Sequence, residues 1–151
     1  MNIQTLHNKF IEFSKNYQIS FSRIALFIIF FWFGILKVIG TSPANPLVAE
    51  LLSKTLWFIG PNEFFILFGI FEILIGICFL FRKLNPIGIL LLIPHMFTTV
   101  MPLILLPQIT WQGFMTPTLE GQYIIKNLVI ITTAMGLGAN FSRSTKIPKN
   151  K

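Results

Sequence analysis

Four long blocks of apolar residues alternate along the chain with shorter segments that carry charge, proline, glycine or asparagine. We predict membrane spans at residues 22–39, 62–81, 86–106 and 120–137. Each block is close to the roughly 20 residues that a helix needs to cross the hydrocarbon core. Backbone groups in lipid must pair within their own segment, and the apolar positions do not alternate with period 2. We therefore expect all four spans to be α-helices.

The polar segments at the two ends divide the chain into three parts. We predict a cytoplasmic N-terminal arm at 1–21, a four-span membrane domain at 22–140 and a basic cytoplasmic tail at 141–151. The predicted fold class is all-α, a transmembrane four-helix bundle.

Two connecting segments have patterns of their own. Between the first two spans, Val48, Leu51, Leu52 and Leu56 recur near one helical face, which predicts a short interfacial helix. The segment 107–121 is rich in proline, glycine and threonine, so we expect it to be irregular.

Composition supports a membrane protein and excludes a soluble one. The 151 residues are 54% hydrophobic and 11% charged, whereas soluble domains carry about 25% charged residues. The single cysteine, Cys78, can form neither an internal disulfide nor a CxxC pair. We expect it to be an inert apolar side chain.

The basic residues are distributed unevenly around the spans, which predicts the orientation of the chain. Only Lys54 lies in the two loops assigned to the outside. Nine basic residues lie on the other side: Lys9, Lys15, Arg23, Arg82, Lys83, Arg143, Lys146, Lys149 and Lys151. The excess predicts that both termini face the cytoplasm. We expect the membrane itself to be a bacterial inner membrane. The same excess also favours anionic lipid over nucleic acid as the partner of the net charge of +7.

Four ionisable residues lie inside the predicted spans: Lys37, Glu72, His95 and Lys126. At about 1.5 Å per residue, Glu72 and His95 lie near mid-membrane, roughly 15 Å and 14 Å into their spans. Lys37 lies roughly 21 Å from the inner boundary and Lys126 roughly 9 Å below the outer one. A charge at the centre of a span costs about 2.5–3.5 kcal/mol, so such groups usually face one another. We expect all four to meet, with Glu72 in contact with Lys37 or Lys126.

Glycines accompany two of these charges. Gly34 and Gly40 share a helical face with Lys37, and Gly69 and Gly76 share one with Glu72. Glycine lets helices approach closely, so we expect tight packing beside the charges.

Each ionisable residue also has an interpretation without a functional role. Lys37 could extend to the outer surface, and His95 could satisfy a carbonyl that Pro94 frees. Glu72 and Lys126 could be a purely structural pair. The site residues alone leave these alternatives open.

Several stretches together resemble the DoxX superfamily of small four-helix membrane proteins, and most of all its YkgB-like branch. They are "SRIALFIIFFWFGILKVIG", "NPLVAELL", "GIFEILIGICFL" and "EGQYIIKNLVIITTAMGL", within residues 20–140. The resemblance implies a role in respiration or redox stress, and some members resemble small subunits of quinone-reducing complexes. It also implies that Lys37, Glu72 and Lys126 match intramembrane polar residues of the family. Gln122 and Asn127 stand where the branch is expected to carry charge.

Three function classes fit these observations. In the first, the chain is a redox accessory protein whose Lys37, Glu72, His95, Tyr123 and Lys126 hydrogen-bond a quinone head group or relay its protons. In the second, the chain is a proton or anion permeation unit, and in the third it is a structural membrane subunit. The sequence has no metal-ligand cluster and no nucleotide-binding loop. In the first class, electrons would therefore come from quinol itself or from a redox partner subunit. The chain could also assemble with further copies of itself as a homo-oligomer.

Overall fold

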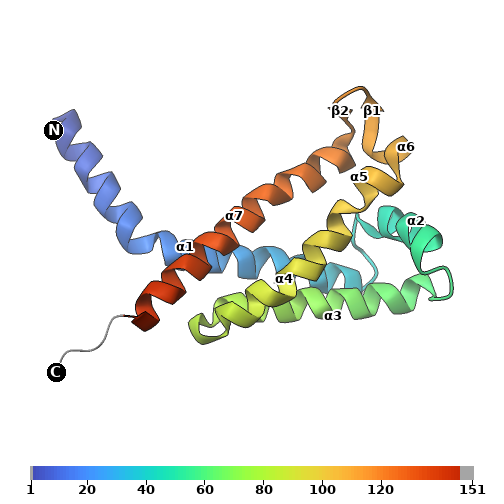
Figure 1. The fold of residues 1–151 in the computed structure, drawn as a ribbon, viewed down its shortest axis with the longest axis horizontal. Helices are drawn as coiled ribbons and strands as arrows, with labels where there is room; N and C mark the ends of the chain where they lie inside the picture. Colours follow the sequence, from blue (N-terminus) through green and yellow to red (C-terminus); the bar gives the residue numbers. More distant parts are fainter. Residues whose placement is uncertain (1, 147–151) are drawn as a thin grey trace.

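The computed structural model describes residues 2–146, with side chains described as far as residue 141. Among these residues, four helical segments are long and apolar enough to cross a membrane (Figure 1). They are built on α1 (Ile3–Val38), α3 (Pro61–Leu80), α4 (Asn85–Val100) and α7 (Leu119–Lys146). The predicted all-α, four-span architecture is confirmed.

Short elements connect these four helices. They are α2 (Asn45–Thr55), the 3₁₀ turn η1 (Arg82–Leu84), α5 (Pro102–Leu105), α6 (Pro107–Thr110), β1 (Trp111–Gly113) and β2 (Thr116–Pro117). Helix α2 is the short helix predicted between the first two spans. It buries Leu52, and the Lys54 ammonium donates to the Leu105 carbonyl at the end of α5 (3.2 Å).

Helix α1 is longer than the span predicted for it. It begins at Ile3, where the Asn2 side chain accepts a hydrogen bond from the Gln4 N–H, and it runs without interruption to Val38. The predicted arm and the first span are therefore one helix. Figure 1 shows the N-terminal part of α1 bending away from α3 and projecting beyond the other helices.

The four long helices pack around one shared core. Leu26 and Phe30 of α1 meet side chains from the three other long helices. These are Ile75 and Phe79 of α3, Leu92 and Met96 of α4, and Ala134 and Leu137 of α7. Because every long helix contributes to this cluster, the four spans form a single bundle.

Helices α1 and α3 lie close enough for their backbones to touch. A Cβ built on Gly34 would lie 2.6 Å from the Gly69 carbonyl oxygen, and one on Gly69 would lie 2.7 Å from that of Gly34. Farther along α3, a Cβ on Gly76 would lie 2.9 Å from the Phe31 nitrogen. The expected close approach is confirmed at these glycines. It is wrong for Gly40, which has φ +77 and empty space around it, and which instead lets the chain turn after α1.

The cytoplasm-assigned ends of α1 and α3 are tied together by one arginine. The Arg23 guanidinium donates to the Phe79 carbonyl (3.1 Å) and to the Leu80 carbonyl. The last carbonyls of a helix have no partner within the helix and carry its negative partial charge. Arg23 therefore caps α3 from the side of α1.

The third span and the segment that follows it differ from the prediction. Pro102 lacks an N–H and separates α4 from α5 within the predicted span. The segment predicted to be irregular contains α6 and an antiparallel β1–β2 pair. Its order comes from side chains that bond backbone carbonyls, since the Trp111 indole N–H reaches Leu103 (3.0 Å) and the Thr118 hydroxyl reaches Ile109 (2.7 Å).

Helix α7 continues to Lys146. The part of it that is apolar enough to cross a membrane is Leu119–Phe141, and the predicted membrane domain ends at residue 140. Residues 147–151 of the predicted basic tail, with Lys149 and Lys151, lie outside the described residues.

Candidate functional site

Glu72 is the centre of a buried polar cluster. Its carboxylate accepts two hydrogen bonds from the Lys37 ammonium, at 2.9 Å to Oε1 and 2.7 Å to Oε2. Oε1 also lies 2.9 Å from Nε2 of His95. Each of the three residues is only 5% exposed. We call Lys37, Glu72 and His95 the triad, and the predicted contact between Glu72 and a lysine is confirmed.

The triad joins three helices, and the glycine contact explains its position. Lys37 and Glu72 each lie three residues after a glycine at the α1–α3 contact, Gly34 and Gly69. A Cβ on Gly69 would come within 3.0 Å of the Lys37 Cβ. Residues three apart share a helical face, so the close approach brings the two charged side chains together. His95 completes the group from α4.

Aromatic rings enclose the triad. The Phe68 ring stacks on the His95 ring at 5.1 Å and an interplanar angle of 8°, and Phe30 meets it edge-on at 5.2 Å. The Phe68 ring centroid also lies 5.7 Å from the Lys37 ammonium nitrogen. Apolar surroundings strengthen hydrogen bonds between charged groups, and they make an unpaired charge costly.

The second nitrogen of the His95 ring faces Thr99. Nδ1 lies 3.4 Å from the Thr99 hydroxyl oxygen, while that hydroxyl donates to the His95 carbonyl at 2.8 Å. A neutral His95 that donates from Nε2 to Glu72 leaves the triad with no net charge. Both ring nitrogens of His95 therefore have a polar neighbour within the apolar enclosure.

The structure rules out two of the interpretations that the sequence leaves open, one for Lys37 and one for His95. The Lys37 side chain does not extend to the outer surface, because it is buried and its ammonium donates to both carboxylate oxygens of Glu72. The His95 ring does not serve a carbonyl freed by Pro94, because its nitrogens face Glu72 and Thr99.

The expected convergence of all four ionisable residues is wrong for Lys126, and Tyr123 stays apart as well. Both side chains are exposed on α7, where the Lys126 nitrogen lies 5.3 Å from the centroid of the Tyr123 ring. The core contacts of α7 come from Ala134 and Leu137, each 11 residues farther along the helix than Tyr123 and Lys126. Because 11 residues are close to three full turns, both pairs lie on nearly the same side of α7. Position along α7, where the helix leaves the core, therefore separates Tyr123 and Lys126 from the triad.

Lys126 instead belongs to a second polar feature, and the sequence already places it on one helical face with Gln122 and Thr133. We define the α7 polar face as Gln122, Lys126, Thr133, Gly136 and Asn140. Their separations of 4, 7, 3 and 4 residues keep them on one side of a helix. Three of them are exposed and two are half-buried. Gly136 and Asn140 are the members that the sequence reasoning missed, and the same spacing could have found them.

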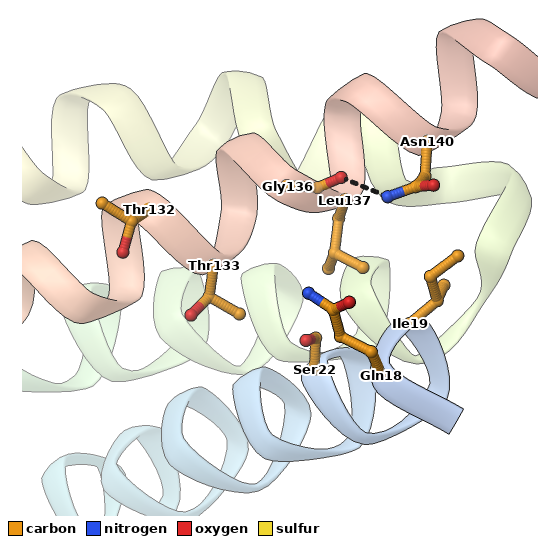
Figure 2. A pocket seen from close by; sticks show the side chains of 8 residues that line it. All are labelled: Gln18, Ile19, Ser22, Thr132, Thr133, Gly136, Leu137 and Asn140. Atoms are coloured by element: carbon orange, nitrogen blue, oxygen red, sulfur yellow. Dashed lines mark hydrogen bonds between the residues drawn. The ribbon is translucent and has the colours of Figure 1, made fainter. Parts of the chain in front are cut away.

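A cavity of about 250 Å³ lies beside the cytoplasm-assigned end of this face, between α1 and α7 (Figure 2). Its lining includes Gln18 and Ser22 of α1 and Thr133, Gly136 and Asn140 of α7. The Asn140 amide donates to the Gly136 carbonyl (2.9 Å), as Figure 2 shows. The cavity is polar, and the triad residues are not part of its lining.

Comparisons of the chain with protein-family models, with curated proteins and with solved structures found no match. Among the described residues, no group of three or more His, Cys, Asp or Glu side chains is arranged to hold a metal ion. The geometry therefore offers two features to interpret, the closed triad and the exposed α7 polar face.

Proposed function

We propose that this chain is an accessory membrane protein that binds a partner subunit through the α7 polar face, while the triad fixes the arrangement of its own helices. The observation that carries the proposal is Lys126, an exposed cation within a membrane-span helix. Neither ion pair found among the described residues includes it. Ionisable groups within spans usually face protein or water and pair with one another.

The chemistry of the α7 polar face favours a different protein over a second copy of this chain. Copies inserted in the same membrane share one orientation, so a two-fold dimer centred on this face would bring Lys126 against Lys126. We therefore expect the partner helix to carry an aspartate or glutamate at the level of Lys126. Gly136 leaves open space where that helix could approach closely, because a Cβ built there meets no atom within 4 Å.

The resemblance to the DoxX superfamily supports a partner from respiration or redox stress. The asymmetry of the basic residues supports a bacterial inner membrane with both termini in the cytoplasm. Labelling of Ser144→Cys and Thr116→Cys variants in intact cells tests this orientation. An impermeant reagent should modify position 116 and not position 144, and the reverse result would invert the topology.

Native mass spectrometry of protein extracted from its own membranes tests the partner. We expect the wild type to carry a second membrane protein in fixed stoichiometry. Lys126→Met should lose it and Lys54→Met, a change of an exposed lysine outside this face, should keep it. If the two variants retain the same associated proteins, the α7 polar face is not the partner site.

A second candidate function is a quinone site at the triad, and the observation that favours it is that Lys37 and His95 meet beside one carboxylate within a ring of aromatic side chains. Quinone carbonyls accept hydrogen bonds and gain protons on reduction, which suits Lys37 and His95. In this case Lys37→Met and His95→Gln should weaken quinone binding by the folded protein, whereas Lys126→Met should not. Absence of binding to the wild type would reject the candidate. The enclosing Phe30 and Phe68 rings give a permeation path through the triad less support.

A further inference from the structure

The N-terminal part of α1 carries an apolar stripe that no described side chain covers. We define the α1 arm as residues 3–21, and the stripe within it as Ile3, Leu6, Phe10, Phe13 and Tyr17. These five side chains are between 49% and 85% exposed. Their spacing of 3, 4, 3 and 4 residues places them on one side of the helix, and the opposite side is polar. An isolated exposed apolar residue needs no explanation, but a continuous stripe of this kind marks an interaction surface.

We propose that the α1 arm lies along the cytoplasm-assigned surface of the membrane, with this stripe inserted at the boundary between head groups and acyl chains. The inference is independent of the partner proposed for α7. It depends only on α1 crossing the membrane.

Continuity with the membrane span identifies lipid as the occupant. At the end of the arm and beyond it, the exposed residues Phe21, Ile24 and Ile28 continue the stripe. With 3.6 residues per turn they fall in the same sector as Phe10 and Tyr17. The face of α1 that meets lipid within the span therefore runs unbroken into the arm.

The length and the bend of α1 indicate that the arm lies outside the hydrocarbon core, at the membrane surface. A helix of 36 residues is about 54 Å long, whereas the hydrocarbon core is about 30 Å thick. The first part of α1 must therefore leave the core. Figure 1 shows it bending away from α3 and projecting beyond the other helices, and the core-facing residues of α1, Leu26 and Phe30, lie nearly opposite the stripe. A bend away from the core turns the stripe toward the membrane, whereas a bend toward the core would turn it toward water.

Aromatic rings and basic residues suit this position. The Phe13 ring lies 4.8 Å from the Tyr17 ring, and the Tyr17 ring lies 6.0 Å from the Phe21 ring, so an aromatic ridge runs along the arm to the point where the span begins. Tyrosine is enriched at membrane interfaces, where its hydroxyl stays in contact with water. Lys9 and Lys15 lie away from the stripe and add attraction to anionic head groups.

A second copy of the chain is the competing occupant, because the same spacing occurs in coiled coils. The composition favours lipid over this alternative. Two-stranded coiled coils prefer aliphatic Ile, Val or Leu at the seam, whereas three of the five stripe residues are aromatic.

Fluorescence quenching on the full-length protein tests the proposal. The protein is reconstituted in vesicles of phosphatidylethanolamine and phosphatidylglycerol, in a Cys78→Ser background. A dye is attached to Phe10→Cys on the stripe or to Asn8→Cys on the opposite side. We expect nitroxide-labelled lipid to quench the dye at position 10 several-fold more than at position 8, and iodide in the buffer to show the reverse order.

Equal quenching at the two positions would overturn the proposal. A second result would also overturn it. If copies labelled with nitroxide at position 10 show dipolar coupling to one another and the label at position 10 makes no contact with lipid, the stripe packs against a second copy. A Phe13→Cys variant with the same readouts shows whether one substitution has disturbed the arm, because its label lies on the same stripe.

Discussion

Two lysines inside the predicted spans have opposite environments. Lys37 is 5% exposed, and both carboxylate oxygens of Glu72 accept hydrogen bonds from its ammonium. Lys126 is exposed and its described contact is the ring of Tyr123, one turn away on the same helix. The first charge is compensated within the chain, while the second has no ion-pair partner among the described residues. We conclude that the α1–α3 seam holds the protein together and that the α7 face remains available for binding.

The strongest test of this comparison is Glu72→Gln, which leaves the Lys37 ammonium buried without an anion. Removal of one partner of a buried ion pair costs about 3–5 kcal/mol. We expect the free energy of unfolding in mild detergent to fall by that amount, as measured by circular dichroism. Glu12→Gln, at an exposed position of the α1 arm, is the matched control. Adding Lys37→Met to Glu72→Gln should restore much of the loss, and equal effects at positions 72 and 12 would contradict the assignment.

A smaller loss is expected from Gly69→Ala, because the new Cβ would lie 2.7 Å from the Gly34 carbonyl oxygen. Forcing extra atoms into a packed contact costs about 1–3 kcal/mol. Gly136→Ala on the α7 polar face is the control, since its Cβ would meet no atom within 4 Å. Thermal unfolding of the two variants side by side measures the difference. Destabilisation by Gly136→Ala to the same degree would mean that the two faces are not packed differently.

Arg23→Met should weaken the same seam at its other end. The variant removes the bonds to the Phe79 and Leu80 carbonyls that cap α3. We expect the free energy of unfolding to fall by about 1–2 kcal/mol, because hydrogen bonds to charged groups and charges at helix ends each contribute on this scale. Hydrogen exchange should show faster opening of the last turn of α3. Lys15→Met provides the comparison, and a similar change in that variant would argue against a specific cap.

The smallest effect is expected from Lys126→Met. This side chain has no ion-pair partner among the described residues, so the free energy of unfolding in detergent should change by less than about 0.5 kcal/mol. The same variant should lose the associated membrane protein. A marked loss of stability in the isolated chain would show that Lys126 supports the fold and would remove the contrast with Lys37.

The spans and the central ion pair could be predicted because they depend on local signals. Apolar runs of sufficient length predict the four spans, and the cost of a charge in lipid predicts that Glu72 meets a lysine. The glycines near Lys37 and Glu72 predict a close approach, although one of them, Gly40, has a different role.

The choice of lysine and the extent of α1 could not be predicted in the same way. Counting residues gives the depth of Lys37 and Lys126 but not how closely α7 approaches α1 and α3 at that depth, which the packing of the whole core determines. The polar composition of residues 1–21 suggested a separate arm, and the spacing of Ile3, Leu6 and Phe10 was not used. That spacing would have predicted that the arm is helical.

The order of the triad along the chain has a consequence for how the protein is made. Lys37 leaves the ribosome 35 residues before Glu72, which at usual synthesis rates is a delay of roughly 2–7 s. During that interval α1 carries a cation with no anion to meet it, and α1 alone is poorly suited to enter lipid. The insertion machinery must therefore retain α1, or hold its lysine near the surface, until α3 emerges. Helices α1 and α3 would then enter the bilayer as one hairpin, with the glycine contact already formed.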